Sequence, residues 1–364
     1  MSVWRDTTPA VGNPGQPEFA ERTGEKVDLH IGVWKDGRWS YLFGDDTSYG
    51  GAMPDIEAIR SAARAAREGP LPEAVSGPVM KAPVWTWEVP LYFWFGGIAA
   101  GSSFVALACD LAGDEESAAV ARKVALGALA PSPVLLILDL GRPGRFVNML
   151  RIFKPRSPMS MGAWALTAFG NLAAAAVGAD LLGRRRAARA MGAANAVVGG
   201  YLGSYTGVLL ASTAVPVWAR SRLFLGPIFV STATATGAAA CRLALSAGGM
   251  PAGHPTRRAL GRVELGAMTA ELLLSVINER RLGPLAGGLG RGRPGKLFKA
   301  AKWSVRAGLA LQVLGRRRAP DHVSSLLYLA AGLMFRYAWV TAGPPSARDD
   351  RAVAEMARSR RHGH

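Results

Sequence analysis

The chain has 364 residues, of which 49% are hydrophobic and 19% are charged, and its formal net charge at pH 7 is +17. A soluble domain is expected to carry about a quarter charged residues, and here the apolar residues are gathered into long runs. This composition excludes an ordinary soluble domain and favours an all-α integral membrane protein with several spans. The basic residues fall in short connections between apolar runs, which indicates membrane orientation and lipid contact and not a nucleic-acid partner.

The cysteines and histidines do not form a pattern typical of a metal or haem site. Cys109 and Cys241 both lie in apolar runs, and no CxxC sequence occurs. The five histidines all lie outside the middle of the apolar runs: His30, His254, His322, His362 and His364. We therefore expect no iron–sulfur cluster, haem or other metal in this chain, so that any redox chemistry must use a diffusible cofactor or the centres of a partner.

Residues 1–83 form a polar N-terminal extension. It has no apolar stretch near its start and no twin-arginine pair, so no secretion signal is expected. The segments VDLHIGVW and RWSYLF around Lys35-Asp36-Gly37 predict a small hairpin, and Pro54–Glu68 predicts a short helix. The extension is too small to bury a core alone. We expect it to lie on a partner subunit; the alternative is a disordered tail.

From Trp85 onward the apolar runs predict about eight transmembrane helices. The second span contains Pro131 and Pro133, which predicts a kink, and Lys299, Lys302 and Arg306 interrupt the seventh. Small residues are frequent in the first, fourth and fifth spans, which predicts close helix packing. The predicted spans are 88–110, 122–140, 160–182, 190–214, 224–247, 261–279, 299–315 and 323–343.

The connection DLGRPGRFVNMLRIFKPRSPMSMGAW, residues 139–164, joins two apolar runs and is strongly basic. A basic connection of this kind is expected at a membrane face, with a solvated surface loop as the alternative. An even number of spans places both termini on the side of this connection and of 215–223 and 280–300. These three connections have a small excess of Lys and Arg over the opposite ones, which include Arg122 and Arg257, and the excess predicts cytoplasmic termini.

Two sets of ionisable side chains are candidates for chemistry. Glu88 and Tyr92 lie one helical turn apart near the start of the first span, where an acid and a phenol together could bind a quinone carbonyl and exchange its proton. The alternative is an interfacial salt bridge beside an aromatic belt residue.

The second set lies deeper in the predicted spans. It comprises Glu264 and Glu271 on the sixth span, Arg306 on the seventh and Arg336 on the eighth. Ionisable residues inside a membrane are expensive and point to function. A pair of Glu271 with Arg306 or Arg336 would relay protons or serve as a structural ion pair, and the sequence leaves both open.

Several stretches together resemble one protein family. They are EVPLYFWFGGIAAGS, DLGRPGRF with SPMSMGAW, YTGVLLASTAVPVW and FRYAWVTAGPPSA, in the order of the sequence and covering about residues 83–347. The chain resembles the NrfD/PsrC family, the quinone-reactive integral membrane subunits of polysulfide-reductase-type complexes. The resemblance implies two four-helix bundles, here 84–215 and 216–345, followed by the basic tail 346–364.

The resemblance also implies function and partners. Such subunits are not catalytic alone. They exchange electrons between menaquinone or ubiquinone and a [4Fe-4S] ferredoxin-like subunit, often joined to a molybdopterin oxidoreductase such as polysulfide reductase or formate dehydrogenase. The implied place is the bacterial inner membrane, and cytoplasmic termini would favour a formate-dehydrogenase-like partner. Coupled proton movement is a further expectation.

Individual site residues follow from the same resemblance. Tyr92 takes the place of a first-helix histidine in the family's quinone site, and Tyr205 matches a tyrosine of the fourth helix. Asp139, Arg142 and Arg145 match a loop beside the same pocket. With Glu88 and Tyr92 as proton-exchanging groups, these residues form the candidate site. Two other functions stay open from the residues alone: a transporter, since glycine-rich helices with Glu/Arg pairs also occur there, and a passive anchor without quinone contact.

Overall fold

The computed structural model describes residues 80–139, 146–151, 153–314, 321–350 and 352–354, together with Glu57, Arg60 and Arg64. The hairpin expected near Asp36, the loop residues Arg142 and Arg145, and the end of the chain after 354 lie outside the described residues. Glu57, Arg60 and Arg64 are helical, and all three belong to the helix predicted over 54–68.

Each predicted span coincides with a long helix or, for the second span, with two helices in line. No strand occurs among the described residues, so the predicted all-helical architecture is confirmed for them. The long helices are α3 (Glu88–Leu111), α4 (Glu115–Leu129) continued by α5 (Pro131–Asp139), α7 (Pro158–Leu181), α8 (Arg185–Ala211), α10 (Arg222–Ala247), α11 (Pro255–Leu282), α13 (Gly292–Leu314) and α14 (Asp321–Thr341). The short ones are α6 (Phe146–Arg151), α9 (Pro216–Arg220), η3 (Gly283–Ala286), α12 (Gly287–Gly290) and α15 (Gly343–Ala347).

Five segments of the described chain are both long and apolar enough to cross a membrane, which makes this a multi-pass membrane protein. They are Glu88–Leu111, Glu115–Asp139, Pro158–Leu181, Arg222–Ala247 and His322–Ala347. Helices α8, α11 and α13 have 27, 28 and 23 residues, enough to cross about 30 Å of hydrocarbon at about 1.5 Å per residue. These three are more polar, so the count of eight spans stays a prediction.

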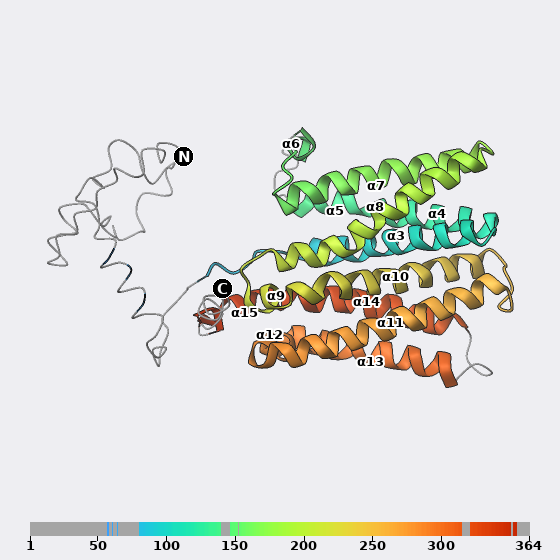
Figure 1. Ribbon diagram of the computed structural model, residues 1–364. Helices are drawn as coiled ribbons and strands as arrows, with labels where there is room; N and C mark the ends of the chain where they lie inside the picture. Colours follow the sequence, from blue (N-terminus) through green and yellow to red (C-terminus); the bar gives the residue numbers. More distant parts are fainter. Residues whose placement is uncertain are drawn as a thin grey trace. The chain divides into compact units, whose positions relative to one another are not determined.

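Residues 74–364 form one compact unit in which α3, α8 and α10 pack on one another at the centre. Figure 1 shows α4 and α7 beside α3 and α8, α11 and α14 beside α10, and α13 beside α11 and α14. The short elements α6, α9, α12 and α15 lie at the end where α3 begins. The division into two four-helix bundles stays a prediction.

The closest approach inside this unit is the crossing of α3 and α10. A Cβ atom added to Gly101 would lie 1.9 Å from the carbonyl oxygen of Ala233, and one added to Gly237 would lie 2.3 Å from the carbonyl carbon of Gly101. The two backbones therefore touch, which only glycine permits. The predicted role of small residues in close packing is confirmed here.

The prolines of the second span break the helix. Helix α4 ends at Leu129, Ala130 is a turn residue, and α5 begins at Pro131. Proline lacks the amide proton that would continue the helix and its ring collides with the preceding turn. The predicted kink is thus present as an interruption of the helix at Ala130, and α5 continues to Asp139.

Tryptophan side chains fix the end of the molecule where α3 begins. Trp218 of α9 is fully buried, and its ring stacks on Trp85 with 5.1 Å between centroids. Its indole nitrogen donates a hydrogen bond of 2.8 Å to the carbonyl oxygen of Trp339 in α14. Three segments far apart in the sequence are therefore held together beside the candidate site.

Charged side chains fix the opposite end. Arg122, expected in a loop, lies in α4 with 5% of its surface exposed, and its guanidinium is 2.6 Å from Asp110 and 2.6 Å from Asp180. Arg257 is also buried and donates to the carbonyl oxygen of Met250. Their placement as loop cations was therefore wrong, because Arg122 pairs with two carboxylates and Arg257 is buried in α11 against a backbone carbonyl.

The turn between α3 and α4 is fixed by Asp114. Its carboxylate accepts hydrogen bonds from the amide of Ser117, as a helix N-cap, and from the hydroxyl of Thr256 at the start of α11. Burial acts to raise the pKa of Asp114, but these hydrogen bonds outweigh it and hold the pKa below its ordinary value.

Candidate functional site

A pocket lies between α3, α5, α7 and α8, near the end of the molecule where α3 begins. Its volume is about 620 Å³, counting the open mouth. Tyr92, Asp139 and Tyr205, predicted as site residues from three separate stretches, all line it. The rest of the lining is apolar: Trp85, Val89, Phe93, Leu135, Leu136, Met149, Met159, Gly162, Ala163 and Leu209.

The local sequence explains how each helix presents its share of the lining. Val89 and Phe93 are four residues apart on α3, as are Leu135 and Asp139 on α5, so each pair shares one helix face. Helix α7 begins at Pro158 after the N-cap Ser157, which orients its first turn towards the pocket.

Tyr205 is fixed in place, and its hydroxyl proton is already donated to a backbone carbonyl. The side chain is 4% exposed, and its hydroxyl donates a hydrogen bond of 2.7 Å to the carbonyl oxygen of Pro158. The ring occupies the space next to Gly162, where an added Cβ would lie 2.2 Å from the phenol oxygen, and it stacks on Tyr201 with 5.6 Å between centroids. Tyr205 therefore shapes the pocket and joins α8 to α7.

Tyr92 is buried to a similar extent but differs in its hydrogen bonding. Its side chain is 6% exposed, and its hydroxyl makes no hydrogen bond to any residue that the structure describes. The phenols of Tyr92 and Tyr205 are close enough to interact electrostatically. A buried hydroxyl normally has a partner, so Tyr92 retains a donor and acceptor for a molecule in the pocket.

The acids lie at the mouth. Asp139 is the last residue of α5, is exposed, and lies within electrostatic range of Glu88. Glu88 is not among the lining residues; its carboxylate accepts a hydrogen bond from the hydroxyl of Thr86. The structure thus groups Glu88 with Asp139 and not with Tyr92 inside the pocket.

The second predicted set of ionisable residues is not a single cluster. Glu264 has no exposed surface and forms an ion pair of 3.1 Å with Arg242 of α10. It also accepts hydrogen bonds from Gln312 at 2.6 Å and Ser325 at 2.7 Å, so it connects four helices. Sequence reasoning missed Arg242, although an arginine within the apolar run of the fifth span was the available signal.

The predicted pairing of Glu271 with Arg306 or Arg336 is not a direct ion pair in the structure. Glu271 accepts a hydrogen bond of 2.7 Å from Ser275, and no ion pair joins it to either arginine in the described part of the chain. Arg336 is buried, donates to the carbonyl oxygen of Phe229 at 3.0 Å and lies 3.7 Å from the centroid of that ring. These contacts hold the guanidinium against α10.

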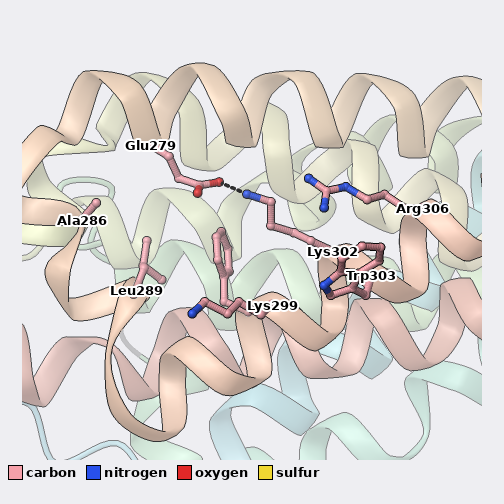
Figure 2. A pocket seen from close by; sticks show the side chains of 9 residues that line it. Glu279, Ala286, Leu289, Lys299, Lys302, Trp303 and Arg306 are labelled. Atoms are coloured by element: carbon pink, nitrogen blue, oxygen red, sulfur yellow. Dashed lines mark hydrogen bonds and ion pairs between the residues drawn. The ribbon is translucent and has the colours of Figure 1, made fainter.

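Arg306 points elsewhere. It is exposed on α13 over the ring of Trp303, at 5.3 Å from the ring centroid. Figure 2 shows it in a second pocket, near the ion pair of Lys302 with Glu279, whose nitrogen and oxygen are 2.6 Å apart. Lys302 also lines a small pocket with Glu271, so it lies between the two spaces.

The described residues contain no group of three or more His, Cys, Asp or Glu side chains that could hold a metal ion. Arg142 and Arg145 lie outside the described residues, and their part in the site stays a prediction.

A comparison with protein families gives one match. Residues 76–278 match the family model described as "Polysulphide reductase, NrfD". The match covers more than half of the chain and includes all four helices of the pocket. No curated protein matches the chain significantly. Members of this family are membrane subunits of quinone-interacting oxidoreductase complexes, in which they associate with iron–sulfur and molybdopterin subunits.

Proposed function

Because the chain belongs to the NrfD family of polysulphide reductase proteins, we propose that it is the quinone-reactive subunit of a respiratory complex and that quinone binds in the pocket lined by Tyr92 and Tyr205. The observation that supports this most is that the Tyr92 side chain is buried and lines a mostly apolar pocket, while its hydroxyl has no hydrogen-bond partner among the described residues.

The lining of the pocket suits such a ligand chemically. Small-molecule sites combine an apolar lining with a few polar groups, as this pocket does with Tyr92, Tyr205 and Asp139 among apolar side chains. A bound quinone, menaquinone or ubiquinone, supplies two-electron chemistry coupled to two protons. The aromatic and methionine side chains of the lining suit its ring and isoprenoid tail.

Each polar residue has a distinct part in this proposal. Tyr92 donates a hydrogen bond to a carbonyl oxygen of the ligand and exchanges a proton there. Tyr205 positions the ring plane of the ligand, because its own hydroxyl proton is engaged by Pro158. Asp139 and Glu88 at the mouth pass the proton between the pocket and water.

A [4Fe-4S] ferredoxin-like subunit is the proposed electron partner, with a molybdopterin subunit of the formate dehydrogenase or polysulfide reductase kind beyond it. The basic connection after α5 supports this: Arg151, Lys154 and Arg156 are exposed beside α7, which lines the pocket. Such a surface suits an acidic partner. A cluster docked there would lie near the quinone.

We also propose an orientation with cytoplasmic termini in the bacterial inner membrane. The burial of Arg122 and Arg257 removes two cations from the loops on the opposite side. The excess of loop Lys and Arg on the side of the termini is therefore larger, and the positive-inside rule assigns that side to the cytoplasm. A terminal tag accessible to protease only from the outside would reverse this orientation.

Proton coupling through the second half of the chain is a further part of the proposal. Helix α11 carries four buried polar side chains along one face, Glu264, Glu271, Ser275 and Asn278. Together with Arg336 on α14 and Arg306 at the second pocket, they would form a path for protons along α11. The structural alternative is that the pair of Glu264 with Arg242 only joins helices.

The test of the quinone site is the Tyr92→Phe variant in the purified complex, measured as quinone-dependent turnover. Loss of a proton-exchanging hydroxyl is expected to lower turnover by at least about tenfold while all subunits remain. Tyr201→Phe is the matched control, because Tyr201 is 41% exposed and does not line the pocket. Wild-type turnover in Tyr92→Phe would remove Tyr92 from the site.

A further inference from the structure

A second pocket, between α11, α12 and α13, is unlike the first in charge. Its volume is about 650 Å³ counting the open mouth, and it shares no lining residue with the pocket of Tyr92. Figure 2 shows its charged and aromatic side chains, most of them on α13. Those that matter here are Glu279, Phe298, Lys299, Lys302, Trp303 and Arg306.

Three cations and one carboxylate line this pocket. Lys302 pairs with Glu279, whereas Lys299 and Arg306 have no ion pair with any residue that the structure describes. Arg306 has only the ring of Trp303 beneath it. In Figure 2 the guanidinium of Arg306 and the ammonium of Lys302 point into the same space. The pocket therefore has excess positive charge that an anion would neutralise.

The position of these cations on α13 makes an anionic partner necessary in a membrane. Lys299 and Arg306 lie 7 and 14 residues after Gly292, or about 10 and 21 Å along the axis at about 1.5 Å per residue. Side chains on a helix tilt towards its N-terminus, so the guanidinium of Arg306 reaches back towards the level of Lys302. An unpaired charge at this depth is costly.

The aromatic residues indicate what kind of anion fits. Trp303 is 67% exposed beside Arg306, and Phe298 lies under the ammonium of Lys302 at 5.1 Å from the ring centroid. A small free anion would contact the cations but not the aromatic rings. A phosphodiester with acyl chains would contact both the cations and the rings, because its headgroup binds the cations and its chains pack along the rings.

We propose that this pocket binds an anionic phospholipid, with the phosphodiester beside Arg306 and Lys302 and an acyl chain along Trp303. Basic pockets between membrane helices are typical sites for such headgroups. The lipid neutralises the outer face of α13, which explains how a helix with this many cations packs stably at the edge of the unit. This proposal does not depend on the quinone site.

The proposal is tested on the full complex, purified, stripped of lipid and then mixed with phosphatidylglycerol, phosphatidylcholine or inorganic phosphate. Native mass spectrometry measures retained lipid, and thermal unfolding measures the shift in Tm. Phosphatidylglycerol is expected to stay bound and to raise Tm, and the other two are expected to do neither. Equal retention of both lipids, or an equal Tm shift with inorganic phosphate, would overturn the proposal. These comparisons use the wild-type complex.

A matched pair of variants locates the site. K299Q/R306Q is expected to weaken phosphatidylglycerol retention by about tenfold, which corresponds to 1.4 kcal/mol. K123Q/R262Q removes the same charge from exposed positions on α4 and α11 and is expected to retain the lipid. Unchanged retention in K299Q/R306Q would place the lipid elsewhere.

Discussion

Gly162 determines how far Tyr205 can lie against α7, and this makes it a sensitive probe of the pocket. In Gly162→Ala the new methyl group would meet the phenol at 2.2 Å, so the ring must move and its hydrogen bond to Pro158 is lost. Overpacking of this kind costs about 1–3 kcal/mol. We expect a raised KM for quinone and a lower Tm. Gly178→Ala is the control in the same helix, since no atom lies within 4 Å of its added methyl; equal effects of both substitutions would contradict this role of Gly162.

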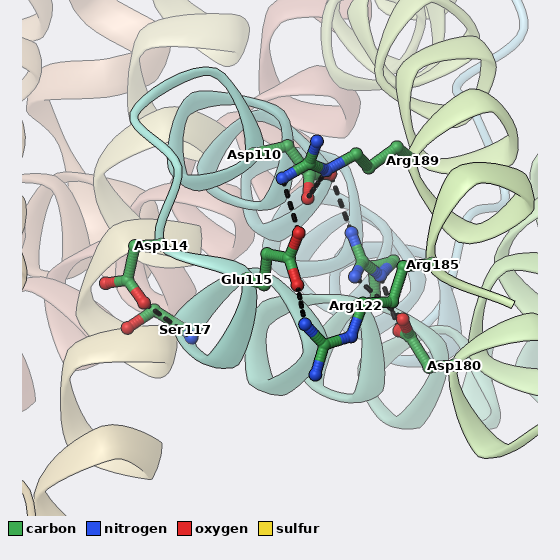
Figure 3. Close-up of polar contacts among 8 residues, drawn as sticks. All are labelled: Asp110, Asp114, Glu115, Ser117, Arg122, Asp180, Arg185 and Arg189. Atoms are coloured by element: carbon green, nitrogen blue, oxygen red, sulfur yellow. Dashed lines mark hydrogen bonds and ion pairs between the residues drawn. The ribbon is translucent and has the colours of Figure 1, made fainter. Parts of the chain in front are cut away.

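Arg122 is the second residue whose removal has a clear expected effect. Figure 3 shows it between Asp110 and Asp180, and the two carboxylates are 6% and 11% exposed. Arg122→Gln leaves both acids without this partner, and breaking a buried pair in this way typically costs about 3–5 kcal/mol. Thermal unfolding in detergent measures the loss.

The control for Arg122 lies in the same cluster. Arg185 pairs with Glu115 but is 77% exposed, and an exposed pair contributes about 1 kcal/mol or less. Arg185→Gln should therefore change Tm little. A similar Tm for Arg122→Gln and Arg185→Gln would show that the buried cluster does not stabilise this end of the molecule.

The family resemblance grouped three residues that the structure brings to one pocket, which spacing in the sequence could not do. Tyr92, Asp139 and Tyr205 lie on three different helices, and no spacing in the sequence indicates that they meet. Spacing alone paired Glu88 with Tyr92, and paired Glu271 with an arginine that in fact contacts α10. Hydropathy locates a helix but not its rotation about its own axis, so the partners of an ionisable residue inside the bundle could not be predicted.

At the scale of elements, the crossing of α3 with α10 offers the sharpest test of packing. Gly101→Ala would place a methyl group 1.9 Å from a backbone oxygen of α10, which cannot rotate away as a side chain can. We expect the helices to separate and the yield and Tm of the purified chain to fall. Gly96→Ala, on the same helix with no atom within 4 Å, should behave as wild type. A wild-type Tm for Gly101→Ala would mean that the two backbones do not touch.

The long helices could be predicted because their apolar runs are long, but their polar ends could not. Helix α13 begins at Gly292, seven residues before the predicted start at 299. Its first turns carry Arg293, Lys296 and Lys299 on exposed positions, and a hydropathy average counts these as loop. The short helix α9 was missed for another reason: five residues do not form a helix alone, and burial of Trp218 stabilises it.

At the scale of the whole molecule, the decisive question is what assembles on the basic end. Affinity purification from native membranes, with mass spectrometry and metal analysis, should yield an iron-containing ferredoxin-like subunit and a molybdenum- or tungsten-containing subunit in fixed ratio. A chain that purifies alone and free of metal would favour the transporter. Full electron transfer in a complex with Glu88, Tyr92 and Tyr205 all replaced would favour the passive anchor.

The surface that holds this partner can be tested in the same preparation. Neutralising Arg151, Lys154 and Arg156 together should release the iron–sulfur subunit at lower salt than in the wild type, because the attraction between exposed charges is screened as ionic strength rises. K123Q/R262Q removes charge elsewhere and should leave the salt dependence unchanged. If both sets of substitutions leave the partner bound equally, its docking surface is not the connection between α5 and α7. The proximity argument that assigns electron entry to the pocket of Tyr92 would then fail, although the pocket itself would remain a candidate for quinone.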